Sequence, residues 1–196
     1  MRIVLASKSP RRIEILGKFI KFESKPSTVE ETYSERMKAK EVAMYLSLIK
    51  AIDIDGKIEE KNALIISADT IVVSDEILEK PKNRDEAFSF LKKLRNRKHK
   101  VITGYTILNQ ANLKKITNYE ETEVIFGDYD DNFINKYLDK KEYRDKAGAY
   151  AIQGYGKLLV KKIIGDYMNI VGFPIYSISK HLKRDFDIDL MDQEDK

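Results

Sequence analysis

The sequence predicts a mixed α/β fold in which helices flank a mixed, twisted β-sheet. Short apolar runs with strand character, such as Ala63–Ala68, alternate with segments whose apolar residues recur at helical spacing. Two apolar runs, Ile71–Val73 and Ile77–Leu78, are separated by three polar residues and predict a hairpin. Alternating helices and strands that include a hairpin indicate a sheet with both parallel and antiparallel strands.

The first helix is predicted directly after a strand at Arg2–Ala6. Ser9 is a favourable N-cap, and Pro10 suits the first turn because its missing N–H would be unpaired there anyway. A second strand is expected at Lys21–Lys25. A second helix is expected at Ser34–Ala51, where the apolar positions include Met37, Val42, Leu46 and Ile49.

The strand Ala63–Ala68 is expected to end at Asp69 and Thr70, after which the hairpin follows. Asn83, with Glu86 three residues later, forms a variant of the capping box and predicts a helix that ends at Leu94. The elements expected after it are strands at Lys100–Leu108 and Ile116–Phe126, a helix at Asn132–Leu138, a glycine-rich segment at Ala147–Gly156, a strand at Leu158–Ile164 and a last helix that begins near Pro174.

The composition is that of an ordinary globular chain. Its 196 residues can bury a full core, and we expect a single domain over residues 1–196 whose charged end, Met191–Lys196, frays. The 36 basic and 32 acidic residues are too balanced to indicate nucleic acid as a partner. No apolar run approaches the ~20 residues of a membrane span, so no membrane partner is expected. The chain has no cysteine, which excludes disulfides and thiolate zinc sites and favours a cytoplasmic location.

The segment Ser7–Arg12 combines two hydroxyl groups, the free N–H groups of a helix start and two guanidinium groups. This combination is typical of a polyanion site, with phosphate as the favoured anion. The alternative is a capped helix whose arginines are merely solvated, and these residues alone favour neither reading.

Asp69 is the sharpest catalytic candidate. We expect it directly after a buried strand, at the carboxyl edge of the sheet, where α/β proteins bind their ligands. A carboxylate there can hold a divalent cation or take a proton from water; alone, it would more simply end a strand with turn chemistry. Lys50, Lys80 and the two arginines can neutralise a triphosphate, while Glu31 and Asp69 can hold Mg²⁺.

A third candidate region is the glycine-rich segment around Gln153. Its glycines and small alanines allow a ligand to approach the backbone closely. Gln153 offers both a donor and an acceptor, which suits reading the edge of a base. The alternative is a glycine-rich turn between strands. His99 and His181 have no partner at metal-ligand spacing, and a structural role is favoured for both.

Together these residues resemble the Maf family of nucleotide pyrophosphatases over almost the whole chain. The matching motifs, in order, are Leu5–Arg12, Val29–Glu31, Ile49–Ala51, Ser67–Thr70, Glu79–Pro81, His99–Thr103, Asp145–Tyr150, Ile152–Gly154 and Val171–Pro174. The resemblance implies a fold similar to that of the inosine-triphosphate pyrophosphatases, an elongated α/β fold with a cleft between two lobes. Members of the family are often dimeric, so a homodimer is a candidate state.

The resemblance also implies a role for each motif residue. Asp69 would accept a proton from the water that attacks the α-phosphate, and Glu31 would assist it in holding a divalent cation, Mg²⁺ or Mn²⁺. The residues implied to bind the substrate phosphates are Ser7, Ser9, Arg12, Lys50 and Lys80.

Three further positions separate two specificities within the family. Here they hold Arg11, Thr70 and Gln153, a set that resembles the branch acting on dTTP and UTP. The implied reaction is hydrolysis between the α- and β-phosphates, giving the monophosphate and pyrophosphate. Modified pyrimidine triphosphates are further candidate substrates. The alternatives are a 7-methyl-GTP-type pyrophosphatase, and a regulator of septum formation that binds nucleotide or nucleic acid without turnover.

Overall fold

The computed structural model describes residues 1–192. Its strands are β1 (Arg2–Leu5), β2 (Glu23–Ser24), β3 (Ala63–Val73), β4 (Ile77–Leu78), β5 (Lys98–Asn109), β6 (Lys115–Phe126) and β7 (Val160–Ile164). Its α-helices are α1 (Pro10–Gly17), α2 (Ala39–Lys57), α3 (Arg84–Leu94), α4 (Asp131–Asp139), α5 (Tyr167–Val171) and α6 (Ile175–Phe186), and two 3₁₀ segments are η1 (Ala147–Ala149) and η2 (Tyr155–Leu159).

The predicted mixed α/β class is confirmed. The strands follow the order β2-β1-β3-β5-β6-β7, and β4 pairs with β3 off this path. Strand β1 runs parallel to both β2 and β3, whereas β4 is antiparallel to β3 and β7 is antiparallel to β6. The sheet is therefore mixed, and the predicted hairpin is its β3–β4 pair.

The chain divides into two compact units. The first consists of residues 1–69, 103–120 and 172–196, and the second of residues 70–102 and 121–171. Strands β3, β5 and β6 supply residues to both units. The expected single domain over the whole chain stays a prediction.

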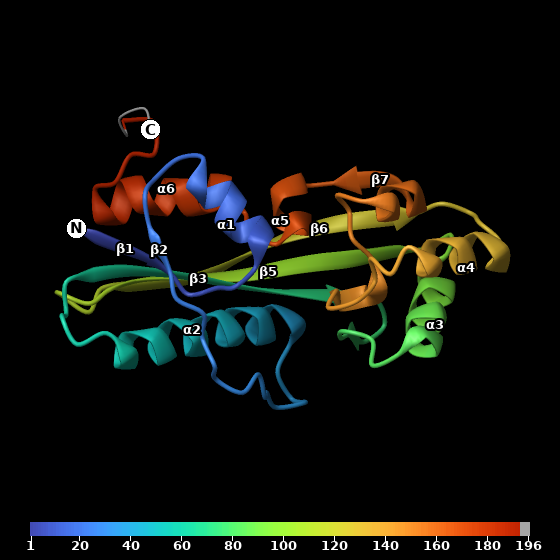
Figure 1. Ribbon diagram of the computed structural model, residues 1–196, viewed down its shortest axis with the longest axis horizontal. Coiled ribbons are helices and arrows are strands. Elements are labelled where there is room, and N and C mark those ends of the chain that lie inside the picture. The colour runs from blue at the N-terminus through green and yellow to red at the C-terminus, as the bar shows by residue number, and fades with distance from the viewer. Residues whose placement is uncertain (193–196) are drawn as a thin grey trace. The chain divides into compact units, whose positions relative to one another are not determined.

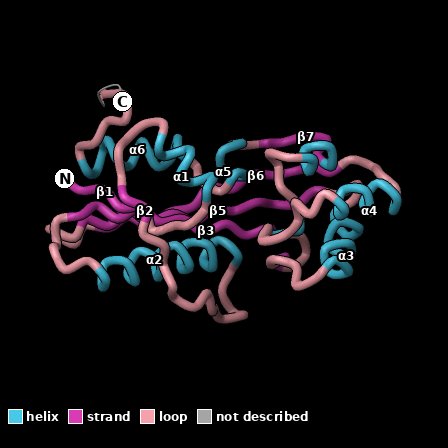
Figure 2. Tube along the Cα trace, in the orientation of Figure 1, coloured by secondary structure: helices cyan, strands magenta, loops and turns pink. Residues whose placement is uncertain are grey.

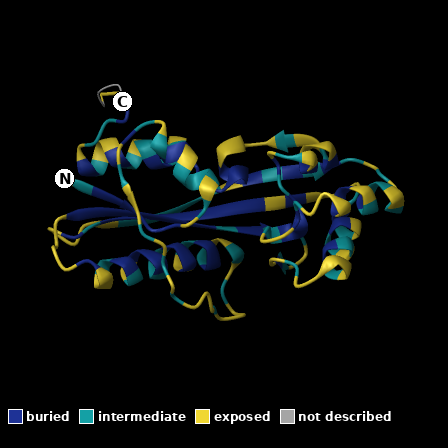
Figure 3. Ribbon diagram, viewed as in Figure 1, coloured by how far each residue is buried: buried dark blue, intermediate teal, exposed yellow. Residues whose placement is uncertain are grey.

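Within the first unit, helices cover both faces of the strands. Figure 1 shows α1 and α6 on one side of β1 and β3, and α2 on the other. The buried residues of α2 lie on its side that faces the strands (Figure 3). Ala51 and Ile54 of this helix belong to one core cluster with Val4 of β1 and Ile65 of β3. Packing of this face fixes α2 against the sheet and thereby the direction of its other side chains.

Within the second unit, α3 packs against both α4 and η1. Arg84, at the start of α3, donates to the side chain of Asn135 over 2.9 Å and to Asp139 over 3.0 Å. The cap predicted for α3 is also present, because the Asn83 side chain accepts a hydrogen bond from the Glu86 N–H at 2.9 Å.

The predicted bounds of the second helix were wrong at both ends. Helix α2 begins at Ala39, where the Glu41 carboxylate accepts a hydrogen bond from the Lys38 N–H at 2.9 Å. It continues beyond Ala51 because Ile54 is fully buried and prolongs the apolar face. The chain between β2 and α2 is a long loop instead (Figure 2).

Strand β3 was also predicted too short. It does not end at Asp69 and Thr70 but continues to Val73, because Ile71 and Val72 are buried and because Val72 and Val73 pair with β4. The last strand begins at Val160 rather than Leu158, since residues 155–159 form η2. The predicted fraying of residues 191–196 concerns mainly residues 193–196, which lie outside the described residues.

Candidate active site

The turn between β1 and α1 is shaped by its own serine residues. The Ser7 hydroxyl accepts a hydrogen bond from the Ser9 N–H at 3.1 Å, and Ser7 is buried. Ser9 is the N-cap of α1 and Pro10 its first residue, as predicted, but the Ser9 side chain forms no capping hydrogen bond. The Ser9 hydroxyl therefore stays available to a ligand at the helix start, where N–H groups favour anions.

The Arg12 side chain bonds to two other segments of the first unit. Its Nε donates to the carbonyl of Gly172 at 2.8 Å and its Nη1 to the carbonyl of Ala68 at 2.7 Å. Burial lowers the pKa of Arg12, while the charges of Asp69 and Glu31 act in the opposite direction. Arg12 is therefore not a solvated surface arginine: its guanidinium is fixed in the electrostatic field of the two candidate carboxylates.

Arg11 is partly buried, and one of its buried hydrogen-bond donors has no partner in the described chain. Burial lowers the pKa of its guanidinium, and its buried Nε finds no hydrogen-bond partner among residues 1–192. Leaving a buried donor unpaired costs roughly 1–3 kcal/mol, so such groups call for an explanation. An acceptor on a bound ligand would provide one.

Lys50 brings the two candidate carboxylates together. Its ammonium group donates to Asp69 Oδ1 and lies 2.8 Å from Glu31 Oε1. Lys50 is 9% exposed and Asp69 7% exposed, whereas Glu31 lies on the loop before α2. The structure thus assembles three of the predicted residues, one each from a helix, a strand and a loop.

The position of Asp69 corrects its sequence-based description. It lies inside β3, not after its end. The last pair between the parallel strands β1 and β3 joins Leu5 to Ile66, so the carboxyl end of β1 is reached three residues before Asp69. The charged residues therefore gather beyond the end of β1, where β1 no longer pairs with the longer strand β3.

The remaining candidate residues, Thr70, Lys80 and Gln153, belong to the second unit. Thr70 continues β3, Lys80 is exposed after β4, and Gln153 is exposed in the turn before η2. The Gly148 N–H donates to the carbonyl of Glu79 at 3.2 Å, which ties the glycine-rich segment to the residue that precedes Lys80. This segment is therefore docked on the hairpin and is not a bare turn between strands.

Gly148 shows how closely the segment is docked. It has a φ of 65°, and a Cβ at this position would lie 2.8 Å from a methyl carbon of Val72, two residues beyond Thr70. No side chain fits there without displacing β3. The side chain of Gln153, in contrast, is exposed, and its amide forms no hydrogen bond anywhere in the described part of the chain.

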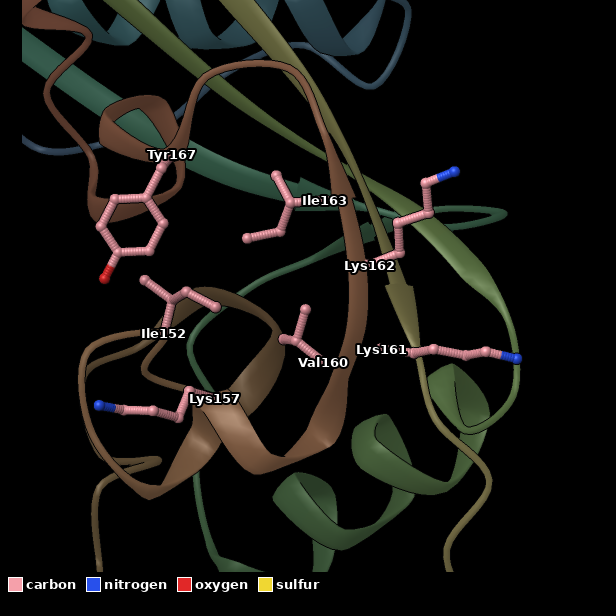
Figure 4. Close-up of a pocket in the computed structure, with 7 residues that line it drawn as sticks. All are labelled: Ile152, Lys157, Val160, Lys161, Lys162, Ile163 and Tyr167. Atoms are coloured by element: carbon pink, nitrogen blue, oxygen red, sulfur yellow. The ribbon is translucent and has the colours of Figure 1, made fainter.

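A hollow of about 320 Å³ lies next to the glycine-rich segment, in the same unit. Figure 4 shows apolar side chains grouped along it, and the ammonium ends of Lys161 and Lys162 directed away from them. The residues that line the hollow are Ile152, Lys157, Val160, Lys161, Lys162, Ile163 and Tyr167. Sequence analysis predicted none of them as a site residue, although Ile152 directly precedes Gln153.

The donor set fits a divalent cation in one respect. Two carboxylates, those of Glu31 and Asp69, converge on a single positive charge, the Lys50 ammonium group. Within residues 1–192 no group of three or more acidic or histidine side chains could hold a metal ion by itself. Such a pair matches the usual coordination of Mg²⁺, which binds one or two protein carboxylates and completes its coordination shell with substrate phosphates and water.

The mixed sheet defines an α/β protein, and beside the end of β1 it carries a partly buried cluster of charged side chains. The chain belongs to the Maf family, because the family model described as "Maf-like protein" matches residues 2–185. Within residues 1–192, no helix is long and apolar enough to cross a membrane.

Curated relatives match nearly the whole chain. A protein of Thermoanaerobacter sp. (strain X514) is 50% identical over 97% of this chain and 100% of its own length. One from Alkaliphilus oremlandii is 44% identical over 97% and 99%, and one from Pyrococcus abyssi is 44% identical over 94% and 96%. All three carry the name dTTP/UTP pyrophosphatase.

Among solved structures, a HAM1 protein from Coxiella burnetii is 14% identical, with a TM-score of 0.44 over 64% of this chain and 73% of that one.

Proposed function

We propose that this chain is a nucleoside triphosphate pyrophosphatase that hydrolyses dTTP and UTP between the α- and β-phosphates. Relatives of that name, 44–50% identical over nearly full length, support the substrate class. The observation that carries the chemistry is the Lys50 ammonium group between Asp69 and Glu31, next to a helix start with two arginines.

The triphosphate is proposed to bind at the start of α1. The Ser9 hydroxyl and the first N–H groups of the helix offer donors to phosphate oxygens. Ser7 accepts one hydrogen bond in the turn and retains its own hydroxyl proton for the substrate. Arg12 and Lys50 supply fixed positive charge, and Lys80 is proposed to add to it from the hairpin.

Asp69 is proposed to accept the proton of the attacking water. It acts from a rigid strand, and the Lys50 ammonium fixes the orientation of its carboxylate. A bound Mg²⁺ or Mn²⁺, held by Glu31 and Asp69 with the substrate phosphates, would neutralise charge on the leaving pyrophosphate. As the phosphates enter, Lys50 can exchange a carboxylate oxygen for a phosphate oxygen without losing its ion pairing.

Base selection is proposed to rest on Arg11, Thr70 and Gln153. The buried Nε of Arg11 has no partner in the described chain, as expected for a group that reads a ligand. The Gln153 amide is exposed and forms no hydrogen bond there, so it is accessible to a base. A glutamine amide can accept from N3–H of uracil or thymine and donate to O4.

A cytoplasmic location and a homodimer are proposed with this function. The cysteine-free sequence supports a reducing compartment. Light scattering coupled to gel filtration gives the mass in solution, and a mass of one chain at micromolar concentration would overturn the dimer.

The test is an assay of pyrophosphate release with Mg²⁺ or Mn²⁺ and a panel of dTTP, UTP, CTP, GTP and 7-methyl-GTP. We expect release from dTTP and UTP, with nucleoside monophosphate as the second product. Preference for 7-methyl-GTP would contradict the pyrimidine assignment. Salt-sensitive DNA binding without hydrolysis of any triphosphate would favour the regulatory alternative instead.

A further inference from the structure

The segment that carries Gln153 has a strained backbone. Gly148 and Ala149 have φ values of 65° and 63°, in the left-handed region that an alanine adopts only under constraint. The Gln153 amide forms no hydrogen bond within residues 1–192, so no contact of its own holds this side chain. The backbone of the segment sets the position from which the Gln153 side chain extends, and the side chains that hold this backbone are therefore of interest for base recognition.

Tyr150 anchors the segment from inside the second unit. Its hydroxyl forms a hydrogen bond of 2.9 Å with Nε2 of His99, at the start of β5. Tyr150 is 5% exposed and His99 2% exposed. Both rings also pack edge-on against Phe126, with centroids 4.8 and 4.7 Å away. Tyr150 is thus fixed at both its ring and its hydroxyl.

A second anchor acts on the next residue. The Ala151 N–H donates to the hydroxyl of Tyr137, on α4, at 3.1 Å. Tyr137 is 4% exposed, so this contact is also sheltered from water. The two anchored residues, Tyr150 and Ala151, precede Gln153 by three and two residues. Their partners lie on a strand, β5, and a helix, α4, of the same unit.

The burial of the His99–Tyr150 pair keeps it uncharged. Burial lowers the pKa of His99 to about 4 and raises the pKa of Tyr150 above its ordinary value. A neutral imidazole and a protonated phenol therefore face each other throughout the physiological range. The Nδ1 atom of His99 has no partner in residues 1–192, so the hydrogen bond that its ring forms there is the one from Nε2 to Tyr150.

We propose that His99 and Tyr150 are positioning residues for base recognition, and that their buried hydrogen bond sets the backbone from which Gln153 reads the base. The proposal rests on the proposed role of Gln153. Both side chains are buried and would not contact a bound substrate, so the chemical step at Asp69 should be spared when the bond is broken.

The test compares kcat and KM for UTP and CTP, which share a sugar and differ in the base edge. Tyr150→Phe and His99→Leu each remove the hydrogen bond and retain much of the apolar packing. We expect KM for UTP to rise roughly three- to tenfold and the UTP/CTP ratio of kcat/KM to fall by a similar factor, with kcat within about twofold.

Two variants control for a merely structural effect. His99→Gln keeps an amide near the position of Nε2, and we expect it to restore KM and the UTP/CTP ratio toward wild type. Tyr129→Phe removes another hydroxyl of the same aromatic cluster, which bonds the Leu91 carbonyl at 3.3 Å, and should leave both values unchanged. Thermal unfolding confirms that each variant is folded at the assay temperature.

Gln153→Ala separates the two proposals. If it lowers the UTP/CTP ratio and Tyr150→Phe does not, the positioning role is overturned while the proposed base reading stands. If Gln153→Ala leaves the ratio unchanged, the base reading fails, and the positioning role falls with it. A loss of ratio in Tyr129→Phe equal to that in Tyr150→Phe would also overturn the proposal.

Discussion

The residues beside the end of β1 and the segment around Gln153 are held in different ways. Lys50, Asp69 and Arg12 are fixed through their own side chains, by ion pairs and by hydrogen bonds to carbonyl groups. Gln153 makes no such contact and depends on anchors at Tyr150 and Ala151. We infer that the groups proposed for the chemical step are preorganised by charge, whereas Gln153, one of the three residues proposed for base selection, is positioned through its backbone. Single substitutions can disrupt either arrangement without the other.

The largest effect is expected for Lys50→Met. Removing the ammonium leaves two carboxylates facing each other, and breaking a buried ion pair typically costs 3–5 kcal/mol, so the unfolding midpoint should fall steeply. Mn²⁺ should raise this midpoint more in the variant than in the wild type, because Asp69 and Glu31 are no longer occupied by the ammonium group.

Lys57→Met is the matched control for Lys50→Met. Lys57 lies on the same helix and pairs with Asp53 at 2.8 Å, but its side chain is 40% exposed. We expect a loss below about 1 kcal/mol and no change in the response to Mn²⁺. Equal losses in both variants, measured by urea unfolding, would contradict the buried character of the Lys50 cluster.

Gly148→Ala tests the docking of the glycine-rich segment. An alanine would be strained at φ 65° and would press on Val72, so we expect roughly 2–4 kcal/mol of destabilisation. Gly56→Ala is the control, since Gly56 lies in α2 with no atom within 4 Å of its added Cβ, and should be neutral or stabilising by up to about 1 kcal/mol. If Gly148→Ala left the free energy of unfolding unchanged, the segment would not be tightly docked.

A smaller and pH-dependent effect is expected from His99. The pKa of His99 is about 4 in the folded chain, against an ordinary value of 6.5. Between pH 6.5 and pH 4, His99 is therefore protonated in the unfolded chain but neutral in the folded chain. His99 therefore contributes nothing to the pH dependence above 6.5 and lowers stability as pH falls, by about 1.4 kcal/mol per unit and about 3 kcal/mol in total near pH 4.

His99→Gln should remove this part of the acid sensitivity. The measurement is the free energy of unfolding at pH 7 and pH 4.5 for wild type and variant. An identical loss between the two pH values in both proteins would show that His99 does not carry it.

The local features of the sequence were predictable, and the tertiary ones were not. The Ser9-Pro10 cap and the Asn83 cap follow from neighbouring residues, so their helices begin as predicted. The ends of α2 and β3 were missed because burial of Ile54 and pairing of Val72 override local propensity. Asp69 was expected in a turn but lies in a strand, because pairing between strands extends β3 beyond it. A single sequence does not show which strands pair.

The candidate residues show the same division. Motif resemblance named Lys50, Asp69 and Glu31 together, and the structure brings them into contact. The bond between His99 and Tyr150 joins positions 51 residues apart, and nothing in either neighbourhood points to the other. Sequence analysis favoured a structural role for His99 but had no signal for its partner.

Asp69, proposed for the chemical step, and Gln153, proposed to read the base, are held separately. Steady-state kinetics of Asp69→Asn and Gln153→Ala on UTP and CTP tests this division most directly. We expect Asp69→Asn to lower kcat by roughly 10²–10⁴-fold with the UTP/CTP ratio unchanged. Gln153→Ala should lower the ratio and leave kcat for UTP within about twofold, since one hydrogen bond to the base is lost. A change of the UTP/CTP ratio in Asp69→Asn, or near-wild-type turnover by it, would contradict the account.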